Sequence, residues 1–373
     1  MKRRAPQVRS SPRKRGPRAT ERGLWIPSIS ASTRVYDALC AGMNGMERRA
    51  FITLLAAAAA WPLAARAQQA GKTYRLGLLA IGPAALVPLD ERRKTLLSGL
   101  AARGFVEGQN LALVQRSADA HPERLDGLAA ELAAAHVDVL VTFSYPAALA
   151  AKKATKDVPI VVVGAGDPVA TGLVDGLARP GGNITGVTEL STELSAKRLE
   201  ILRDALPALT RVAMLWNAAD LGMTLRFRSA EGAARVLGIK VQTLGVREPD
   251  DFDHAFAEMT RERPDAILMV SDVLTILNRK RVVDFASTNR LPTIYETGAL
   301  VRDGGLMSYG PKQSAIGEIA AGLVARILRG ARPADLPLEL PTHFELLINL
   351  KTAQGLGLAL PPTLVARADE VIE

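Results

Sequence analysis

The fold prediction starts from two short runs, "VDVLVTFS" (Val137–Ser144) and "PDAILMVSD" (Pro264–Asp272). Each run follows a helical stretch, is almost wholly apolar along its middle, and ends at a polar residue. Such a run is typical of a strand that lies buried on both faces of a parallel sheet. The two runs resemble each other, which indicates that one structural unit occurs twice along the chain.

The segments that follow these runs strengthen this interpretation. "VPIVVVGAG" (Val158–Gly166) parallels "LPTIYETGA" (Leu291–Ala299), and "GGNITGV" (Gly181–Val187) parallels "GGLMSYG" (Gly304–Gly310). Strands that alternate with helices predict an α/β fold with parallel, doubly wound sheets. We therefore predict two similar lobes joined by a three-segment hinge; chance similarity among α/β units is the alternative.

The expected lobes are discontinuous in sequence. We predict lobe 1 from residues 74–187 plus 313–337, and lobe 2 from residues 188–312 plus 338–373. With these bounds the chain crosses between the lobes three times. Lobes joined in this way close on a ligand, and ligand contacts to both lobes shift an open–closed equilibrium.

The N-terminal part of the chain predicts export. Arg48 and Arg49 precede an apolar stretch, Phe51–Leu63, and the small-x-small pattern Ala65-Arg66-Ala67 follows it. This order is typical of a signal peptide cleaved before Gln68, and the arginine pair resembles a twin-arginine signal. Because Met46 stands directly before the run, we interpret residues 1–45 as an over-extended gene start, with 46–67 as the signal; a disordered basic tail is the alternative.

Removal of the predicted signal peptide and the segment before it changes what the net charge and the cysteine count imply. The chain carries a net charge of +9, but residues 1–50 hold twelve basic and three acidic residues. With Arg66 also removed, the remainder is close to neutral, at −1, so no nucleic-acid partner is expected. The only cysteine, Cys40, lies upstream of the cleavage site, so neither disulfides nor a lipid anchor are expected. We expect a soluble periplasmic protein that is not inserted in a membrane.

Polar residues at the predicted strand ends are the candidate ligand-binding residues. In open α/β sheets, ligands sit beyond the carboxyl ends of the strands. We expect Ser144, Tyr145 and the Asp167 turn to hold an anionic end of the ligand. Asp272, next to Ser271, or Glu296 should face a cationic end, because a buried ammonium requires a carboxylate. The remaining candidates, which we place in the wall of the site, are Asn217 and Tyr309. The alternative for each strand-end residue is a helix N-cap without further function.

These positions suggest an amino acid, aromatic or branched, as the ligand; a small carboxylic acid without an amine is the alternative. Enzyme signatures are absent from the sequence: there is no P-loop and no Gly-x-Ser-x-Gly elbow. Gly164-Ala165-Gly166 lacks a third glycine at the spacing of a dinucleotide-binding loop, and the four histidines are scattered. We therefore expect neither catalysis, nor a cofactor, nor a metal.

Several stretches, taken together and in order, resemble the ABC transporter substrate-binding protein family whose best-known members bind tryptophan or other aromatic amino acids. The resemblance runs from Arg48 to Glu373, and it is carried by "GFVEGQN" (Gly104–Asn110), "SYPAALAAKKAT" (Ser144–Thr155), "GDPVATGLV" (Gly166–Val174), "RPGGNITGV" (Arg179–Val187), "AKRLEILR" (Ala196–Arg203) and the C-terminal residues Phe344–Glu373. It implies a type I periplasmic-binding fold and a membrane permease as partner. The stretch Lys312–Ala320 departs from the family by lacking aromatic residues, and a sensor that feeds a membrane receptor remains the alternative to transport.

Overall fold

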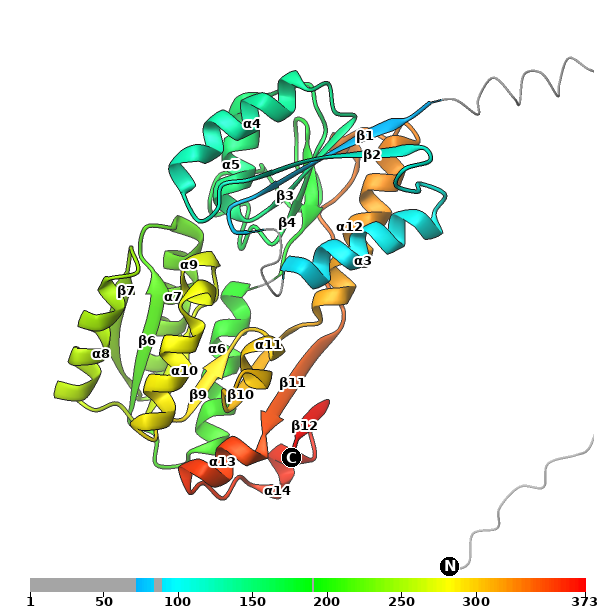
Figure 1. The fold of residues 1–373 in the computed structure, drawn as a ribbon. Coiled ribbons are helices and arrows are strands. Elements are labelled where there is room, and N and C mark those ends of the chain that lie inside the picture. The colour runs from blue at the N-terminus through cyan, green and yellow to red at the C-terminus, as the bar shows by residue number, and fades with distance from the viewer. Residues whose placement is uncertain (1–71, 84–88, 190) are drawn as a thin grey trace, which may run out of the picture. The chain divides into compact units, whose positions relative to one another are not determined.

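The computed structural model describes residues 72–83, 89–189 and 191–373. The predicted signal peptide, the preceding segment and Cys40 lie outside the described residues. Residues 72–373 form one compact unit that is built from two lobes, each with its own sheet (Figure 1).

Lobe 1 is a five-stranded parallel sheet covered on both faces. Its strand order is β2-β1-β3-β4-β5, and the strands span Tyr74–Ala80 (β1), Leu111–Ser117 (β2), Val139–Phe143 (β3), Ile160–Val163 (β4) and Ile184–Val187 (β5). One face packs against α3 (Leu89–Ala102) and α12 (Gln313–Leu328), which also pack on each other. The other face packs against α4 (Leu125–Ala134) and α5 (Tyr145–Ala154). Short 3-10 turns span Pro122–Arg124 and Pro333–Asp335.

Lobe 2 repeats this arrangement and extends it. Its seven-stranded sheet has the order β12-β11-β10-β9-β8-β6-β7, with strands at Arg211–Asn217 (β6), Lys240–Val246 (β7), Ala266–Met269 (β8), Thr293–Tyr295 (β9), Met307–Pro311 (β10), Phe344–Asn349 (β11) and Glu370–Ile372 (β12). The helices span Ser191–Ala205 (α6), Leu221–Val236 (α7), Asp251–Arg261 (α8), Val273–Leu277 (α9), Arg279–Thr288 (α10), Gly298–Arg302 (α11), Leu350–Leu356 (α13) and Pro362–Val365 (α14). Residues of α6 and α7 share one core cluster, and residues of α8 and α10 share the other.

The two sheets confirm the predicted fold class. From β6 to β10 the order is β7-β6-β8-β9-β10, which matches β2-β1-β3-β4-β5 of lobe 1 position by position. The strand β11 is the exception, because it pairs antiparallel with β10, and β12 then adds parallel to β11. Both predicted central runs are strands whose residues are fully buried, Val139–Phe143 and Ala266–Met269.

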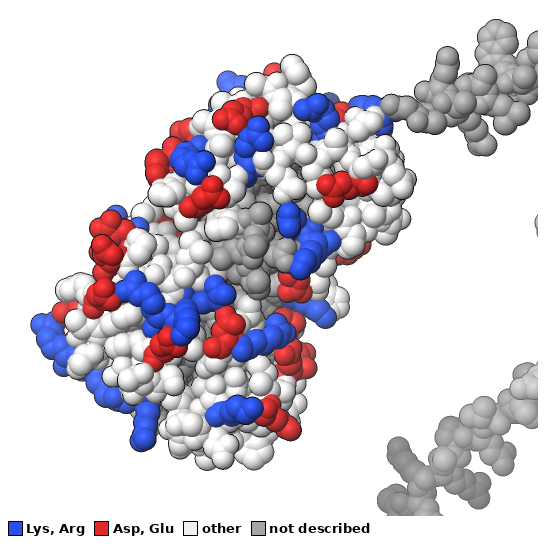
Figure 2. Space-filling view, viewed as in Figure 1, with Lys and Arg blue, Asp and Glu red and all other residues white. Residues whose placement is uncertain are grey.

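The chain passes between the lobes at three places, after β5, after β10 and before β11. The first and third crossings run side by side: Thr188 N–H donates to the Glu339 carbonyl over 3.1 Å, and Glu339 N–H donates to the Gly186 carbonyl over 2.9 Å. Acidic and basic side chains are interspersed over the face shown in Figure 2, and some pair along helices, as Lys280 does with Asp284.

Candidate functional site

A cleft lies where the two lobes meet, with a cavity of about 140 Å³. It is lined from lobe 1 by the ends of β1, β3 and β4 and by the starts of α3 and α5. Lobe 2 contributes the ends of β6, β8 and β9 and the first turns of α7 and α9. The apolar part of the lining includes Ile81, Phe143, Val163, Met223, Val273 and Ile276. The cleft therefore lies at the carboxyl edges of both sheets, as the topology requires.

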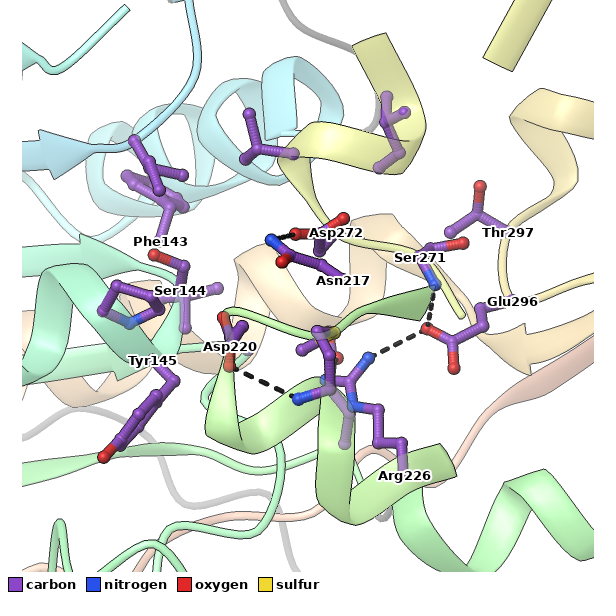
Figure 3. A pocket seen from close by; sticks show the side chains of 18 of the residues that line it. Phe143, Ser144, Tyr145, Asn217, Asp220, Arg226, Ser271, Asp272, Glu296 and Thr297 are labelled. Carbon is purple, nitrogen blue, oxygen red and sulfur yellow. Dashed lines mark hydrogen bonds and ion pairs between the residues drawn. The ribbon is translucent and has the colours of Figure 1, made fainter. Parts of the chain in front are cut away.

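Most of the candidate residues line this cleft. The structure brings together Ser144, Tyr145, Asn217, Ser271, Asp272 and Glu296 (Figure 3). Asp167 and Tyr309 do not belong to the lining. The Asp167 carboxylate accepts hydrogen bonds from Val169 N–H (3.1 Å) and Ala170 N–H (2.9 Å), so it stabilises its own turn. Tyr309 lies within β10 and stacks on Phe344, with a centroid separation of 6.4 Å.

On the lobe 1 side, Ser144 caps α5. Its side chain accepts from Ala147 N–H over 3.3 Å, and Pro146 has no N–H to give. The first turn of α5 therefore offers fewer backbone donors to an anion than a helix start usually does. Tyr145 is 8% exposed, and burial, with a contribution from the Asp220 charge, raises its pKa.

On the lobe 2 side, Asp272 caps α9 and is held on both oxygens. Its Oδ1 accepts from Thr275 N–H (2.9 Å) and Thr275 Oγ1–H (3.0 Å), and its Oδ2 accepts from Asn217 Nδ2–H (2.6 Å). Burial raises the pKa of Asp272 above its ordinary value, and these hydrogen bonds oppose that rise. Asn217, placed in the wall by sequence reasoning, thus fixes the carboxylate next to it.

Asp220 is a further carboxylate in the cleft lining, and sequence reasoning missed it. It caps α7 through Oδ1, which accepts from Gly222 N–H (2.7 Å) and Met223 N–H (3.3 Å). Burial raises its pKa, and the Asp272 charge raises it further. Its position after strand β6 matches that of Asp272 after β8, so the strand-end rule could have found it.

Five alternating charges form a buried network along the cleft. In lobe 2, Glu296 bridges two arginines of the network. Its Oε1 accepts from Arg198 Nη1 (2.9 Å), and its Oε2 accepts from Arg226 Nη1 (2.8 Å). Glu189, on the first crossing between the lobes, pairs with Arg226 Nη2 (3.5 Å) and with Arg92 Nη2 of lobe 1 (2.5 Å). Glu296 is thus already engaged by two arginines and does not offer an uncompensated charge to a ligand.

The Gly-x-Gly segment has a structural explanation in this network. A Cβ atom at Gly164 would lie 2.5 Å from Arg92 Nη1, and one at Gly166 would lie 3.6 Å from Arg226 Nη2. Both glycines also have positive φ, 77° and 69°. The absent side chain at Gly164 therefore lets Arg92 approach the loop after β4, whereas a Cβ at Gly166 would only touch Arg226, and Gly166 is explained by its positive φ.

Sequence reasoning missed all three arginines of the network. Each lies on a helix, Arg92 on α3, Arg198 on α6 and Arg226 on α7, where charged neighbours suggest a solvated face. They are nevertheless 8%, 1% and 3% exposed. Within the part of the chain that the structure describes, no three His, Cys, Asp or Glu side chains are grouped so that they could hold a metal ion.

Two lobes of the same topology, three crossings between them, and a cleft with apolar walls and buried charges define a two-lobed solute-binding protein. Residues 86–372 match the family described as ABC transporter substrate binding protein, and the chain belongs to this family. The relatives are binding proteins and not enzymes. In the described ranges, no helix is both long and apolar enough to cross a membrane.

Individual relatives agree with this membership. The tyrosine-binding protein of Clostridioides difficile is 26% identical over 271 residues, which cover 72% of this chain and 77% of that protein. A structure of an ABC domain from Streptococcus pneumonia in complex with L-Trp is 26% identical, with a TM-score of 0.76 over 81% of this chain and 100% of that one. A conserved domain protein from Vibrio cholerae is 28% identical, with a TM-score of 0.77 over 80% and 100%.

Proposed function

We propose that this protein is an extracytoplasmic solute-binding protein that captures an amino acid with an aromatic side chain and delivers it to an ABC-type permease. The observation that carries the proposal is the composition of the cleft. Its lining combines carboxylates and arginines with apolar side chains such as Phe143, Met223 and Ile276. A zwitterion with an apolar side chain has the matching chemistry. Relatives that bind tyrosine and L-Trp support the same class of ligand.

The two ends of the ligand need partners of opposite charge. We propose that its ammonium group faces Asp272, because that carboxylate lines the cleft and forms no ion pair with an arginine among the described residues. For the carboxylate we propose Arg92 beside Ser144 and Tyr145. The Arg92 side chain is 10% exposed, and its orientation is fixed by Gln313 Oε1, 2.5 Å from Nε, and by Glu189.

A ligand screen tests the proposal. The purified protein is heated with aromatic and aliphatic amino acids, deaminated acids, decarboxylated amines, sugars and nucleosides. A ligand at 100 times its dissociation constant should stabilise the folded state by about 2.7 kcal/mol, which raises the melting temperature visibly. Stabilisation by sugars or nucleosides alone would contradict the proposed ligand class.

A small carboxylic acid without an amine is the second candidate, and the three cleft arginines favour it. The same screen separates the two, because an acid site binds the deaminated analogue at least as well as the amino acid. Export and delivery have their own tests. N-terminal sequencing of periplasmic protein should give Gln68, and ligand-loaded protein should stimulate the ATPase activity of an ABC transporter reconstituted with its permease and ATPase subunits.

A further inference from the structure

The cleft contains a pair of carboxylates that form no ion pair with the network among the described residues, although the charge of Arg226 opposes the rise that burial causes in the pKa of one of them, Asp220. Asp220 follows β6 and Asp272 follows β8, and these two strands are direct neighbours in the lobe 2 sheet. Both aspartates line the same cleft. The view in Figure 3 shows them on the lobe 2 side, with Ser144 and Tyr145 of lobe 1 to the left of Asp220 and the Tyr145 ring extending away from it.

The cap hydrogen bonds leave each aspartate with accepting capacity. Both cap bonds of Asp220 go to Oδ1, so capping does not use Oδ2. Asp272 Oδ2 accepts one hydrogen bond, from Asn217, and a carboxylate oxygen can accept two. An N-cap alone would need only one oxygen of each residue. A second oxygen at each buried carboxylate therefore suits a donor that arrives from the cleft.

The groups around the pair neutralise it only in part. Arg226 on α7 is the charged neighbour; its Nη1 donates to Glu296 and its Nη2 pairs with Glu189. Burial, the largest effect, and the charge of Asp272 raise the pKa of Asp220, but the charge of Arg226 lowers it. Tyr145 on α5 lies near enough to Asp220 for that charge to raise its pKa, and Asn217 on β6 and Thr275 on α9 hydrogen-bond Asp272; these three are uncharged at neutral pH. Burial raises the pKa of both aspartates, and the charge of Asp272 adds to the rise at Asp220. Two buried acids in this setting hold a proton more readily than ordinary acids do.

We propose that Asp220 and Asp272 together hold the ammonium group of the ligand, and that this group replaces a proton that the pair retains in the ligand-free protein. The inference rests on the proposed function, since it requires a ligand with a protonated amine. The carboxyl group releases its proton to the solvent, and the ligand ammonium stays fully protonated, so one cation replaces another. An ammonium group has three N–H donors, enough for both carboxylates and one further acceptor.

Two consequences distinguish this site from a single ion pair. Ligand binding releases protons, most strongly in the pH range where the pair is partly protonated. The affinity for amines falls as the pH is lowered, because protonation of the pair removes the charge that the ammonium needs. The fall begins at a higher pH than the ordinary aspartate pKa of about 3.9 would give.

Isothermal titration calorimetry tests the proposal with an aromatic L-amino acid and its deaminated analogue. At mildly acidic pH, the wild-type protein should release up to about one proton per ligand, measured from the dependence of the binding enthalpy on the buffer. The variant Asp220→Asn should lose this release. It should also bind the amino acid about 10-fold to 150-fold more weakly, the range expected for loss of a hydrogen bond to a charged group.

Matched variants keep the interpretation specific. Asp265→Asn alters a lobe 2 aspartate that also accepts backbone hydrogen bonds, from Thr210 and Arg211, but lies outside the cleft, and it should leave binding unchanged. Asp220→Ser keeps a good N-cap without a charge, and it replaces Asp220→Asn if that variant folds poorly. Neither Asp220 variant should weaken binding of the deaminated analogue.

The outcomes separate the inference from the proposed function. If the wild-type protein binds the amino acid, but Asp220→Asn changes neither affinity nor proton release, the carboxylate pair is overturned and the proposed function stands. If the protein binds only the deaminated acid, with both aspartates dispensable, the amino-acid proposal and the carboxylate pair are both overturned. Equal weakening of amino acid and deaminated analogue in Asp220→Asn would also overturn the pair, since a role in holding the ammonium cannot affect a ligand without one.

Discussion

Arg198 Nη1 lies 2.9 Å from Glu296 Oε1, and the two side chains are only 1% and 8% exposed. Arg198 Nε also donates to the Tyr309 carbonyl over 2.7 Å, which ties α6 to β10 just before the second crossing between the lobes. Through Arg226 and Glu189 the chain of ion pairs continues to Arg92 of lobe 1. The network therefore consists of residues that line the cleft, and it also links the lobes.

The stability of lobe 2 should depend on Glu296. Glu296→Gln keeps the shape of the side chain but leaves Arg198 and Arg226 without a shared counter-charge, and breaking a buried pair costs about 3–5 kcal/mol. Urea denaturation of the ligand-free protein measures this loss. The control is Glu200→Gln, which breaks an exposed ion pair between Glu200 and Lys197 on α6. This variant should lose under about 1 kcal/mol of stability. Equal effects of the two variants would show that the buried network contributes no more than a surface pair.

Gly164 should be intolerant of a side chain for two separable reasons. Residue 164 has a φ of 77°, which is unfavourable for alanine. In Gly164→Ala, the added Cβ would also lie 2.5 Å from Arg92 Nη1. Gly108→Ala shares the φ problem, at 78°, but its Cβ meets no atom within 4 Å among the described residues. Positive φ alone costs about 1–2 kcal/mol, so Gly108→Ala should lose about that amount.

The extra destabilisation of Gly164→Ala over Gly108→Ala, again measured by denaturation, reports the displacement of Arg92. We also expect Gly164→Ala alone to weaken ligand binding, because the displaced guanidinium belongs to the cleft. If both variants lose the same stability and bind equally well, the contact between Gly164 and Arg92 is not needed for either property.

Alkaline pH should destabilise the protein through Tyr295. Burial raises the pKa of Tyr295 to about 12, against about 10 in the unfolded chain. Between these values the folded state keeps a proton that the unfolded state has released, so stability falls as the pH rises through this window. Below it, Tyr295 has no effect of this kind.

Tyr295→Phe should remove this part of the pH dependence. Relative to the variant, the wild-type protein should lose up to about 3 kcal/mol between pH 10 and 12, two pKa units at about 1.4 kcal/mol each. Denaturation curves of both proteins, compared at neutral and alkaline pH, give the difference. A difference that stays constant from pH 8 to 12 would contradict a raised pKa at Tyr295.

The sequence predicted those parts of the fold and site that follow from strand position. Buried strands such as Val139–Phe143 can be recognised in the sequence because their apolar character is local. The residues directly after such strands lie at one edge of the sheet. This is why Ser144, Asn217 and Asp272 were predicted in one cleft. Tyr309 failed the same rule because β10 continues to Pro311, so this tyrosine lies inside the strand and packs on Phe344.

The remaining site residues depend on contacts between distant segments. Arg92 stands in "DERRKTLL", where periodicity alone cannot separate it from Arg93 and Lys94. Only the packing of α3 against Glu189 and Gln313, residues far along the chain, buries the first of these charges. For the same reason the antiparallel return of β11 was not predicted, since it depends on the path of the third crossing.

Arg92 should determine whether a ligand needs a carboxylate. Arg92→Gln removes the lobe 1 charge from the cleft while it retains hydrogen-bonding capacity. Binding of an aromatic amino acid and of its deaminated analogue should both weaken about 10-fold or more, as for loss of a hydrogen bond to a charged group. Binding of the decarboxylated amine should change little. Calorimetric titration with all three ligands measures this selectivity.

The neighbouring Arg93 provides the control. Arg93 Nη1 donates to Gln115 Oε1 over 3.0 Å, and Arg93 does not line the cleft, so Arg93→Gln should leave all three affinities unchanged. The amine is the decisive ligand, because the ion pair between Arg92 and Glu189 also links lobe 1 to the hinge. If Arg92→Gln weakens the amine as much as the acids, Arg92 acts on closure of the lobes through Glu189, and the ligand carboxylate must be held elsewhere, with Ser144 and Tyr145 as the remaining lobe 1 candidates.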